Sequence, residues 1–287
     1  MKSEKTIVAI MYDFDNTLST RDMQEFSFIP KLGMTPEEFW NEANNFAKNR
    51  NMDGILAVMY MMMQKTLGTD LCSRKNLKEC GKNVEFYDGV ETWFKRINEF
   101  AALNNVELEH YIISSGLKPM IEGTKIGKYF NQIYACDYLY DDNGLPLWPA
   151  LSVNYTAKIQ FLYRIHKGVF EVCEDNRLNS LIPDEEKHVS FSNMIFIGDG
   201  MTDVPCMKLT RQNGGYSIGV FKPQARNVYL MRDDRVDFFA PADYSEGSEI
   251  ERIIQTIILK ISAEFQLEKI TKSHQERASL KENNCNK

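Results

Sequence analysis

The sequence predicts an α/β fold, in which a Rossmann-like, mostly parallel sheet carries helices on both faces and a helical segment is inserted. Three observations lead to this prediction. An apolar run of strand length, residues 6–12, ends abruptly in two carboxylates. From residue 87 onward, short apolar runs alternate with helical patterns, as strands and helices do in a parallel sheet. Between these parts, residues 19–86 have the pattern of helices and are rich in methionine.

The composition is that of a globular protein that is large enough for one domain with an insertion. Of 287 residues, 43% are apolar and 26% are charged, which excludes a disordered chain. The net charge of −6 argues against a nucleic-acid partner, which would require a basic face. No apolar run approaches the roughly 20 residues that span a bilayer, so we expect no membrane partner. The six cysteines form no Cys-x-x-Cys pair and the N-terminus has no signal-peptide layout, so we expect a cytoplasmic protein with reduced cysteines.

The first strand and the residues directly after it are the stretch on which the rest of the prediction depends. The run from Thr6 to Tyr12 suits a strand buried on both faces, and ligands of open α/β sheets bind beyond the carboxyl ends of such strands. Asp13 and Asp15 follow there, on one side of the chain if the strand continues, with Phe14 turned the other way. Two carboxylates so close together need a cation or a proton. Taken alone, the pattern also fits a strand followed by an Asp/Asn turn.

Residues 19–86 take the place of the helix that is expected after a first strand. Thr35-Pro36-Glu37-Glu38 marks a helix start, with threonine as the N-cap, proline at the first position and glutamate three residues after the cap. Asp53-Gly54 opens a second helix that runs through Leu67. Its stretch over 55–63 is apolar nearly all round, which indicates the centre of a small bundle. The alternative is that its methionines are an adaptable lining for a substrate cleft.

From residue 87 the chain alternates between helices and strands. A helix follows Asp88-Gly89, and a strand over 108–113 runs into Ser114-Ser115-Gly116. Asp141-Asp142-Asn143-Gly144 predicts a hairpin turn. The further elements that we expect are a helix over 117–126, a strand over 133–135, a helix over 156–166 with Lys158 in its first turn, a helix and surface loop over 171–188, strands over 194–197, 217–221 and 236–239, and a helix over 250–261. Residues after about 265 are polar, and we expect a frayed tail over 267–287.

Four separate places carry reactive or phosphate-handling groups, and three of them come directly after predicted strands. These places are Asp13 with Asp15, Ser114-Ser115-Gly116, Lys158, and Gly198-Asp199-Gly200-Met201-Thr202-Asp203. Each matches a need of phosphoryl transfer, since carboxylates hold Mg²⁺, a hydroxyl and N–H groups at a helix start bind phosphate oxygens, and a lysine offsets charge on the transferring group. Singly, Ser114 also fits a helix N-cap, Lys158 a solvated lysine and Asp203 a cap for the following helix.

In this order the motifs resemble those of the haloacid dehalogenase superfamily, and the chain is similar to its phosphatases over roughly 1–18 and 87–260. The resemblance implies that Asp13 attacks phosphorus and that Asp15 is the general acid and base. It implies a Mg²⁺ cofactor, bound by Asp13, by the backbone carbonyl of Asp15 and by Asp199. Asp203 would bind the metal through water or orient the lysine.

The resemblance also assigns phosphate-binding residues and a branch of the superfamily. Ser114, or Ser115 in a shifted register, would hold the phosphate together with Gly116 and Lys158. The helical insertion, the Ser-x-Gly after the second strand, the hairpin before Lys158 and the Gly-Asp-Gly-x-x-Asp run are most similar to the phosphoserine phosphatase-like branch, which has a C1 helical cap.

The same resemblance divides the chain into a core, residues 1–18 and 87–287, and a C1-type helical cap, residues 19–86, which closes over the substrate. In that branch a cap acid and a cap arginine grip the amino acid, and Asp22 and Arg21 lie about where these are expected. Two segments, 171–188 and 241–247, depart from the branch. We therefore expect a small phosphorylated metabolite as the partner, without choosing phosphoserine.

Together these observations predict a Mg²⁺-dependent phosphatase that hydrolyses a small phosphate monoester through an aspartyl-phosphate on Asp13. Asp15 favours ester hydrolysis, because the dehalogenase branch lacks this second carboxylate. One alternative is a phosphotransferase such as a mutase, which uses the same intermediate and excludes water. The other is a non-catalytic phospholigand-binding regulatory module. The sequence leaves the oligomeric state open.

Overall fold

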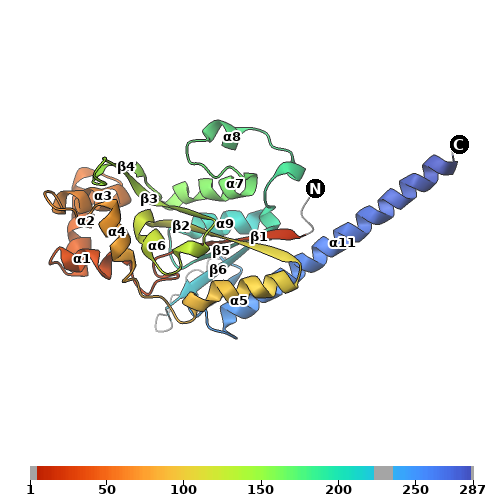
Figure 1. Ribbon diagram of the computed structural model, residues 1–287, viewed down its shortest axis with the longest axis horizontal. Coiled ribbons are helices and arrows are strands. Elements are labelled where there is room, and N and C mark those ends of the chain that lie inside the picture. Colours follow the sequence, from red (N-terminus) through yellow and green to blue (C-terminus); the bar gives the residue numbers. More distant parts are fainter. Residues whose placement is uncertain (1–4, 223–234, 286–287) are drawn as a thin grey trace.

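The computed structural model describes residues 5–222 and 235–285, and in this part of the chain seven strands form one sheet surrounded by helices (Figure 1). The strands are β1 (Thr6–Tyr12), β2 (Val106–Leu117), β3 (Gln132–Tyr140), β4 (Pro146–Leu151), β5 (Met194–Gly198), β6 (Tyr216–Phe221) and β7 (Phe238–Pro241). Their order is β4-β3-β2-β1-β5-β6-β7, and every pair is parallel except the β3–β4 hairpin. The predicted mostly parallel α/β sheet is confirmed.

The first strand lies at the centre of the sheet, between β2 and β5. Its residues from Val8 to Tyr12 are fully buried, which explains the unbroken apolar run. Tyr12 is level with Ile112 of β2 and with Ile197 of β5. The residues that follow these three strands therefore meet at one edge of the sheet.

Helices cover both faces of the sheet, as predicted. On one face lie α5 (Val90–Leu103) and the start of α11 (Glu249–Cys285), and on the other lie α7 (Ile159–Lys167) and α9 (Val204–Gln212) (Figure 1). The shorter helices around the core are α6 (Lys118–Gly123), α8 (Asp175–Asn179) and the 3-10 turns η2 (Gly127–Tyr129), η3 (Tyr155–Lys158), η4 (Asp184–Glu186) and η5 (Phe191–Asn193). Among the described helices, none combines the length and apolar character needed to cross a bilayer.

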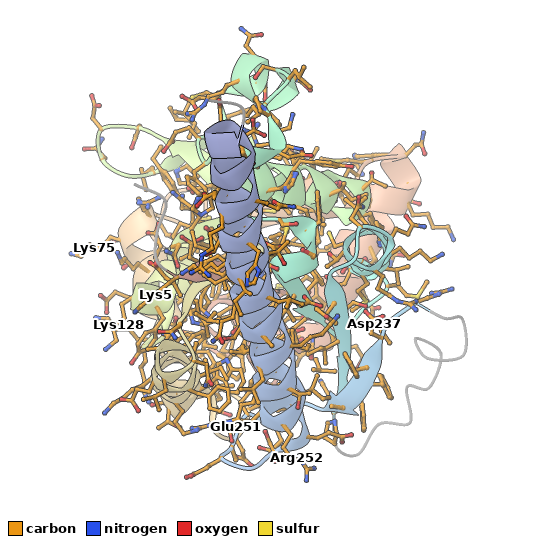
Figure 2. The ribbon with its side chains drawn as sticks, turned by 90° about the vertical axis from the view of Figure 1, so that its right-hand side faces the viewer. Lys5, Lys75, Lys128, Asp237, Glu251 and Arg252 are labelled. Atoms are coloured by element: carbon orange, nitrogen blue, oxygen red, sulfur yellow. The ribbon has the colours of Figure 1, made fainter. Side chains whose placement is uncertain are left out.

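The last helix is longer than predicted. Instead of fraying after about residue 265, α11 continues to Cys285 and extends away from the sheet (Figure 1). Figure 2 labels Glu251 and Arg252 near its start, where the helix packs against the core. Over 263–279 nearly all its side chains are exposed, so packing does not stabilise this part. The stretch is rich in Glu, Lys, Gln, Leu and Ala, whose helix propensity accounts for the continued helix. Residues 286 and 287 of the expected tail lie outside the described residues.

The inserted segment is helical, as predicted, and lies beside the carboxyl edge of the sheet (Figure 1). It comprises η1 (Met23–Glu25), α1 (Phe28–Lys31), α2 (Pro36–Arg50), α3 (Gly54–Lys65) and α4 (Arg74–Gly81). The predicted capping box is present, because the Glu38 N–H donates to Thr35 Oγ1 at 3.2 Å and the Thr35 N–H donates to Glu38 Oε2 at 2.9 Å. The helix α3 begins after Asp53 as predicted and ends two residues before Leu67.

The two connections between the insertion and the sheet run side by side. The Thr20 N–H donates to the Glu85 carbonyl and the Tyr87 N–H to the Leu18 carbonyl, both at 3.0 Å. Ser19 and Phe86 form the antiparallel bridge between them. We call these paired residues, 18–20 and 85–87, the linker pair.

Two predicted boundaries in the core are wrong. β2 continues through Ser114 and Gly116 to Leu117, because a register shift after Ile113 lets Leu117 pair with Cys136 of β3. The helix α6 therefore begins at residue 118 and is shorter than the expected 117–126. The predicted hairpin is confirmed, and the β3–β4 pairing around it makes β3 longer than the expected 133–135.

Candidate active site

Carboxylates follow the two central strands at the edge where these strands end. The Asp13 N–H donates to the Ile197 carbonyl at 2.9 Å, which continues the β1–β5 pairing one residue beyond Tyr12. Asp199 follows the last residue of β5. Asp13 and Asp199 are 186 positions apart in the sequence. The sheet register brings them together, which no local sequence pattern could do.

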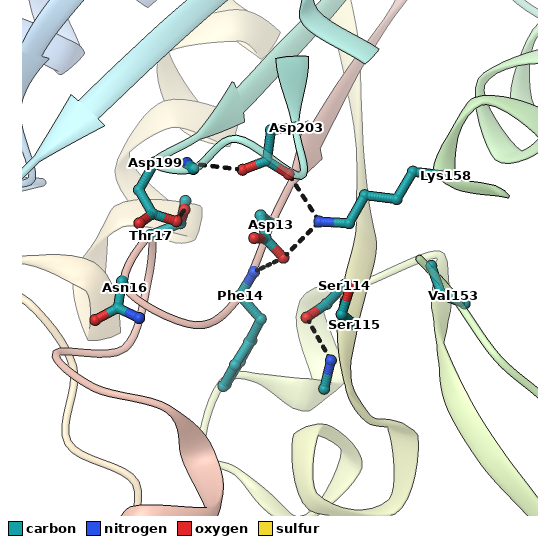
Figure 3. Close-up of polar contacts among 12 residues, drawn as sticks. Asp13, Phe14, Asn16, Thr17, Ser114, Ser115, Val153, Lys158, Asp199 and Asp203 are labelled. Atoms are coloured by element: carbon teal, nitrogen blue, oxygen red, sulfur yellow. Dashed lines mark hydrogen bonds and ion pairs between the residues drawn. The ribbon is translucent and has the colours of Figure 1, made fainter. Parts of the chain in front are cut away.

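Lys158 lies between two of the carboxylates (Figure 3). Its Nζ is 3.2 Å from Asp13 Oδ1 and 2.7 Å from Asp203 Oδ1. The lysine and Asp203 are fully buried. Burial lowers the pKa of Lys158, but the carboxylates of Asp13 and Asp203 outweigh this effect and raise it overall, so the lysine is a cation at neutral pH. The lysine is placed by η3, which leads into α7, and it is not the solvated side chain that a lone lysine would be.

Asp203 is held at both of its oxygens. Oδ1 contacts Lys158, and Oδ2 accepts a hydrogen bond from the Gly200 N–H at 3.1 Å. Glycine at 198 allows this close approach, because a Cβ there would lie 2.5 Å from Asp203 Oδ2. Burial and the charge of Asp13 raise the pKa of Asp203 to about 6, against the opposing effect of the lysine. Both oxygens of Asp203 are thus fixed by contacts, one of them with the lysine.

Asp199 completes an acidic group that suits a metal ion. One carboxylate oxygen each of Asp13, Asp199 and Asp203 lies within 4.8 Å of the others. Thr17 Oγ1 donates to Asp199 Oδ1 at 3.3 Å. Burial, followed by the charges of Asp13 and Asp203, raises the pKa of Asp199 to about 8. Hard oxygen donors and an excess of negative charge are what Mg²⁺ requires, so these residues fit that ion.

Asp15 lies in a different environment from Asp13. Its Oδ1 accepts a hydrogen bond from the Met23 N–H at 2.8 Å. Burial, followed by the charges of Asp22 and Asp13, raises the pKa of Asp15 well above its ordinary value. A shift in this direction stabilises the protonated form of Asp15 relative to its ionised form. Asp22 is close by, and its Oδ1 accepts a hydrogen bond from Asn16 Nδ2 at 2.9 Å.

The serine motif lies across the cavity from the acidic group (Figure 3). Ser114 Oγ accepts a hydrogen bond from the Gly116 N–H at 3.1 Å, so its own proton is free to be donated to a ligand. Ser115 Oγ is buried without a hydrogen-bond partner among the described residues. Both serines line the cavity, and the structure does not choose between them.

Gly116 differs from the prediction. It does not line the cavity, and α6 begins two residues later, so its N–H is not a free donor at a helix start. A Cβ on Gly116 would lie 2.0 Å from Met23 Cε and 3.0 Å from Asp15 Oδ2. The glycine thus allows β2 to pass close to the Asp15 loop.

A cavity of about 310 Å³ lies between the carboxylates and serines of the sheet edge and the inserted helices. Its lining residues are Asp13, Asp15, Asn16, Asp22, Gln24, Trp40, Ile55, Val58, Met59, Met62, Ser114, Ser115, Leu117, Asp199, Gly200, Met201 and Thr202. Met59 and Met62 are buried and also line the cavity, so the methionines both fill the bundle and face the site. The wall opposite the carboxylates is mostly apolar.

The structure does not bring Arg21 to the cavity. Arg21 is exposed, and its guanidinium lies 4.4 Å from the centre of the Phe26 ring. Sequence analysis missed Gln24 and Trp40, which line the cavity from η1 and α2. No local pattern marks them, because their direction depends on how the helices pack. The hydrogen bond from Thr17 to Asp199 was also not predicted. The position of Thr17 two residues after Asp15 could have suggested a place in the site.

The Rossmann-like sheet, with Lys158 and three carboxylates at the carboxyl edge of its central strands, defines the structural class, and sequence comparison identifies the family. The haloacid dehalogenase-like hydrolase family matches residues 10–208, and the chain belongs to it. A protein of Borreliella burgdorferi (strain ATCC 35210 / DSM 4680 / CIP 102532 / B31), described as uncharacterized, is 25% identical over 291 residues, which cover 91% of this chain and 100% of that protein.

Solved structures show the same fold. A substrate-bound phosphoserine phosphatase is similar with a TM-score of 0.54 at 14% identity, over 88% of this chain and 99% of that one. A haloacid dehalogenase family hydrolase from Salmonella enterica serovar Typhi gives 0.53 at 20% identity, over 80% and 66% of the two chains. A probable phosphoserine phosphatase from Vibrio cholerae gives 0.56 at 10% identity, over 92% and 69%. At these identities the likeness concerns the fold, and it agrees with the predicted branch.

Proposed function

We propose that this chain is a Mg²⁺-dependent phosphatase that hydrolyses a small phosphate monoester through an aspartyl-phosphate on Asp13. The observation that carries the proposal is the grouping of Asp13, Lys158, Asp199 and Asp203 at the carboxyl ends of β1 and β5. Family membership and the fold likeness to phosphoserine phosphatases support it.

In this proposal Asp13 is the nucleophile. Contacts from the Phe14 N–H at 2.8 Å and from Lys158 fix the direction of its carboxylate. A carboxylate oxygen attacks phosphorus, and the bond from phosphorus to the ester oxygen breaks. Lys158 and the Ser114 hydroxyl hold the phosphate oxygens as their charge rises. Asp15 gives its proton to the departing oxygen, so the alcohol leaves neutral.

The second half of the reaction restores the enzyme. Asp15, now ionised, takes a proton from a water molecule, whose oxygen attacks phosphorus and releases phosphate from Asp13. The raised pKa of Asp15 suits both steps, because the group must hold a proton at first and accept one later. Asp13, Asp199 and the backbone carbonyl of Asp15 would hold Mg²⁺, which would supply positive charge to offset the repulsion between carboxylate and phosphate. Asp203 would bind the ion through water or orient Lys158, which it contacts.

The inserted helices, residues 19–86, act in this proposal as a cap that excludes water from the cavity. The cavity of about 310 Å³ limits the leaving group to a small metabolite. Its leaving-group end presents Asp22 and Gln24 beside an apolar wall that includes Trp40. We therefore propose Asp22 as a substrate contact. Arg21 does not line the cavity, so we do not propose it as one. The buried free cysteines favour a reducing compartment, and we propose the cytoplasm.

The test is hydrolysis of p-nitrophenyl phosphate with and without Mg²⁺, measured as free phosphate. Asp13→Asn should lower kcat at least about a thousandfold, because the nucleophile is lost. Asp15→Asn should also lose ester hydrolysis while Mg²⁺ still stabilises the protein against heat. The matched control is Asp70→Asn, which makes the same chemical change on an exposed cap residue and should leave kcat unchanged.

Turnover by Asp13→Asn at the wild-type rate would refute the proposed mechanism. Mass spectrometry after acid quenching should find one phosphoryl group on the wild-type chain and none on Asp13→Asn. Phosphate that appears on a second acceptor instead of in solution would identify a phosphotransferase.

A further inference from the structure

One sequence segment has no part in the chemistry proposed above. Residues 241–247, which depart from the phosphoserine phosphatase-like branch, begin with the last residue of β7 and lead toward α11. Within this segment Tyr244 is fully buried, although its neighbours Ser245 and Glu246 are not. Its ring packs edge-on against Trp93 of α5, with 5.6 Å between centroids and 70° between planes. The tyrosine thus points from a surface connection into the core.

The Tyr244 hydroxyl reaches the loop that follows the proposed nucleophile. It donates a hydrogen bond to the backbone carbonyl of Thr17 at 3.1 Å. Thr17 is fully buried, and its own hydroxyl donates to Asp199 Oδ1 at 3.3 Å. Figure 3 shows the Thr17 and Asp199 side chains next to each other at the end of β5. Two hydrogen bonds and one residue therefore connect Tyr244 to Asp199.

Tyr244 is itself fixed by the helices on that face of the sheet. Its N–H donates to the Asp88 carbonyl at 2.8 Å, and its carbonyl accepts from Nη2 of Arg96. Nε of Arg96 lies 3.0 Å from Glu251, which is buried near the start of α11 (Figure 2). The fit around the Tyr244 backbone is close, because a Cβ on Gly89 would lie 2.2 Å from the Tyr244 carbonyl carbon. The hydroxyl is therefore attached to a part of the molecule that packing keeps in place.

The Asp199 carboxylate needs such a fixed partner. Asp13 and Asp203 lie beside it and repel it, and the Thr17 hydroxyl is the hydrogen-bond donor that the structure records for it. In metal sites, partners that orient a ligand typically change metal affinity 10–100-fold when they are removed. A partner that holds the orienting residue acts on the metal in the same direction.

We infer that Tyr244 is a positioning residue for the metal site: it holds the Thr17 backbone, and the Thr17 hydroxyl in turn keeps the Asp199 carboxylate directed at the ion. The inference rests on the proposed function, since it takes Asp199 as a Mg²⁺ ligand. It gives the connection between β7 and α11 a role in the chemistry of the site.

The test removes only the hydroxyl, with Tyr244→Phe. The first measurement is the thermal unfolding temperature as a function of Mg²⁺ concentration, which reports binding without activity. The second is the Mg²⁺ concentration for half-maximal hydrolysis of p-nitrophenyl phosphate. Both midpoints should rise about tenfold. The KM for p-nitrophenyl phosphate at saturating Mg²⁺ should stay unchanged, because Tyr244 does not line the cavity.

Tyr134→Phe is the matched control. The Tyr134 hydroxyl also donates to a backbone carbonyl, that of Phe170, at 3.1 Å, but on β3 and outside the cavity. This variant loses the same chemical group and should keep the wild-type Mg²⁺ midpoints. Should Tyr244→Phe fail to fold, Arg96→Lys loosens the Tyr244 carbonyl instead and should shift the midpoints in the same direction by a smaller factor.

The outcomes separate this inference from the proposed function. Wild-type and Tyr244→Phe midpoints that agree within twofold, with Mg²⁺ binding to both, would overturn the inference and leave the phosphatase proposal intact. Equal shifts in Tyr244→Phe and Tyr134→Phe would also overturn it, because the effect would then be one of general stability. A wild-type protein that Mg²⁺ does not stabilise would overturn the metal site and this inference with it.

Discussion

Replacing Lys158 by methionine tests the electrostatics of the site most directly. Methionine keeps most of the length and volume of the side chain and removes its charge. The lysine is fully buried, and its Nζ contacts Asp13 at 3.2 Å and Asp203 at 2.7 Å. Lys158 is the cation that the described part of the chain places in contact with Asp13 and Asp203, and without it the acidic group, which also contains Asp199, loses this charge.

The size of the effect follows from this burial. Removing one partner of a buried ion pair leaves an uncompensated charge and costs about 3–5 kcal/mol. We therefore expect Lys158→Met to lower the free energy of unfolding by about that amount in EDTA at pH 8. The loss should shrink when Mg²⁺ is added, because the ion replaces the missing positive charge. Loss of one electrostatic contact to the transferring phosphate should lower kcat about 10²–10³-fold.

The assay is urea unfolding of both proteins in EDTA and in saturating Mg²⁺, with p-nitrophenyl phosphate turnover measured in parallel. Lys82→Met is the control, because Lys82 Nζ lies 2.7 Å from Glu79, the distance of the Lys158–Asp203 contact, but both partners are largely exposed. An exposed pair contributes less than about 1 kcal/mol. If Lys158→Met cost no more than Lys82→Met, the buried acidic group would not need the lysine and the reasoning would be refuted.

Two further predictions concern residues away from the lysine. Burial lowers the pKa of His110 to about 3, against a weaker opposite effect of Glu109, whereas the unfolded chain binds this proton near pH 6.5. Because the unfolded state holds more protons below pH 6.5, the free energy of unfolding keeps its full value above that pH and falls as the pH drops, by about 2 kcal/mol at pH 5. Urea unfolding at pH 7.5 and pH 5 should show a smaller fall in this free energy for His110→Gln than for the wild type. An equal fall in both proteins would contradict the assignment. Gly198→Ala would place a Cβ 2.5 Å from Asp203 Oδ2 and should lower kcat more than about tenfold. The control is Gly54→Ala, whose added Cβ has no atom within 4 Å and which should leave kcat unchanged. Equal kcat values for the two variants would show that the position of Asp203 does not limit the rate.

Local signals in the sequence were enough for several parts of the fold. The capping box at Thr35 involves partners three residues apart, so the sequence contains the whole interaction. The end of β1 at Asp13 was clear because a fully buried strand gives an unbroken apolar run. For Asp13, Lys158 and Asp199, the order of the motifs along the chain predicted a grouping that the β1–β5 register and η3 together produce.

Other parts depend on contacts that the sequence does not contain. The extension of β2 to Leu117 requires its pairing with Cys136 of β3 and the irregular register before it. Which of the residues after Asp15 face the cavity depends on η1, which directs Gln24 toward it while Arg21 stays exposed. Trp40 reaches the cavity because of how α2 packs, which its amphipathic pattern alone does not specify.

The linker pair has a consequence for how this protein varies through evolution. Since Ser19 and Phe86 are bridged neighbours, the insertion begins and ends at nearly one point of the sheet. The helices between Ser19 and Phe86 can therefore change in length or number while the two ends of the insertion stay at the same separation. In the proposed function, where the insertion is the cap, substrate range and catalytic chemistry would then be encoded in different stretches of the gene.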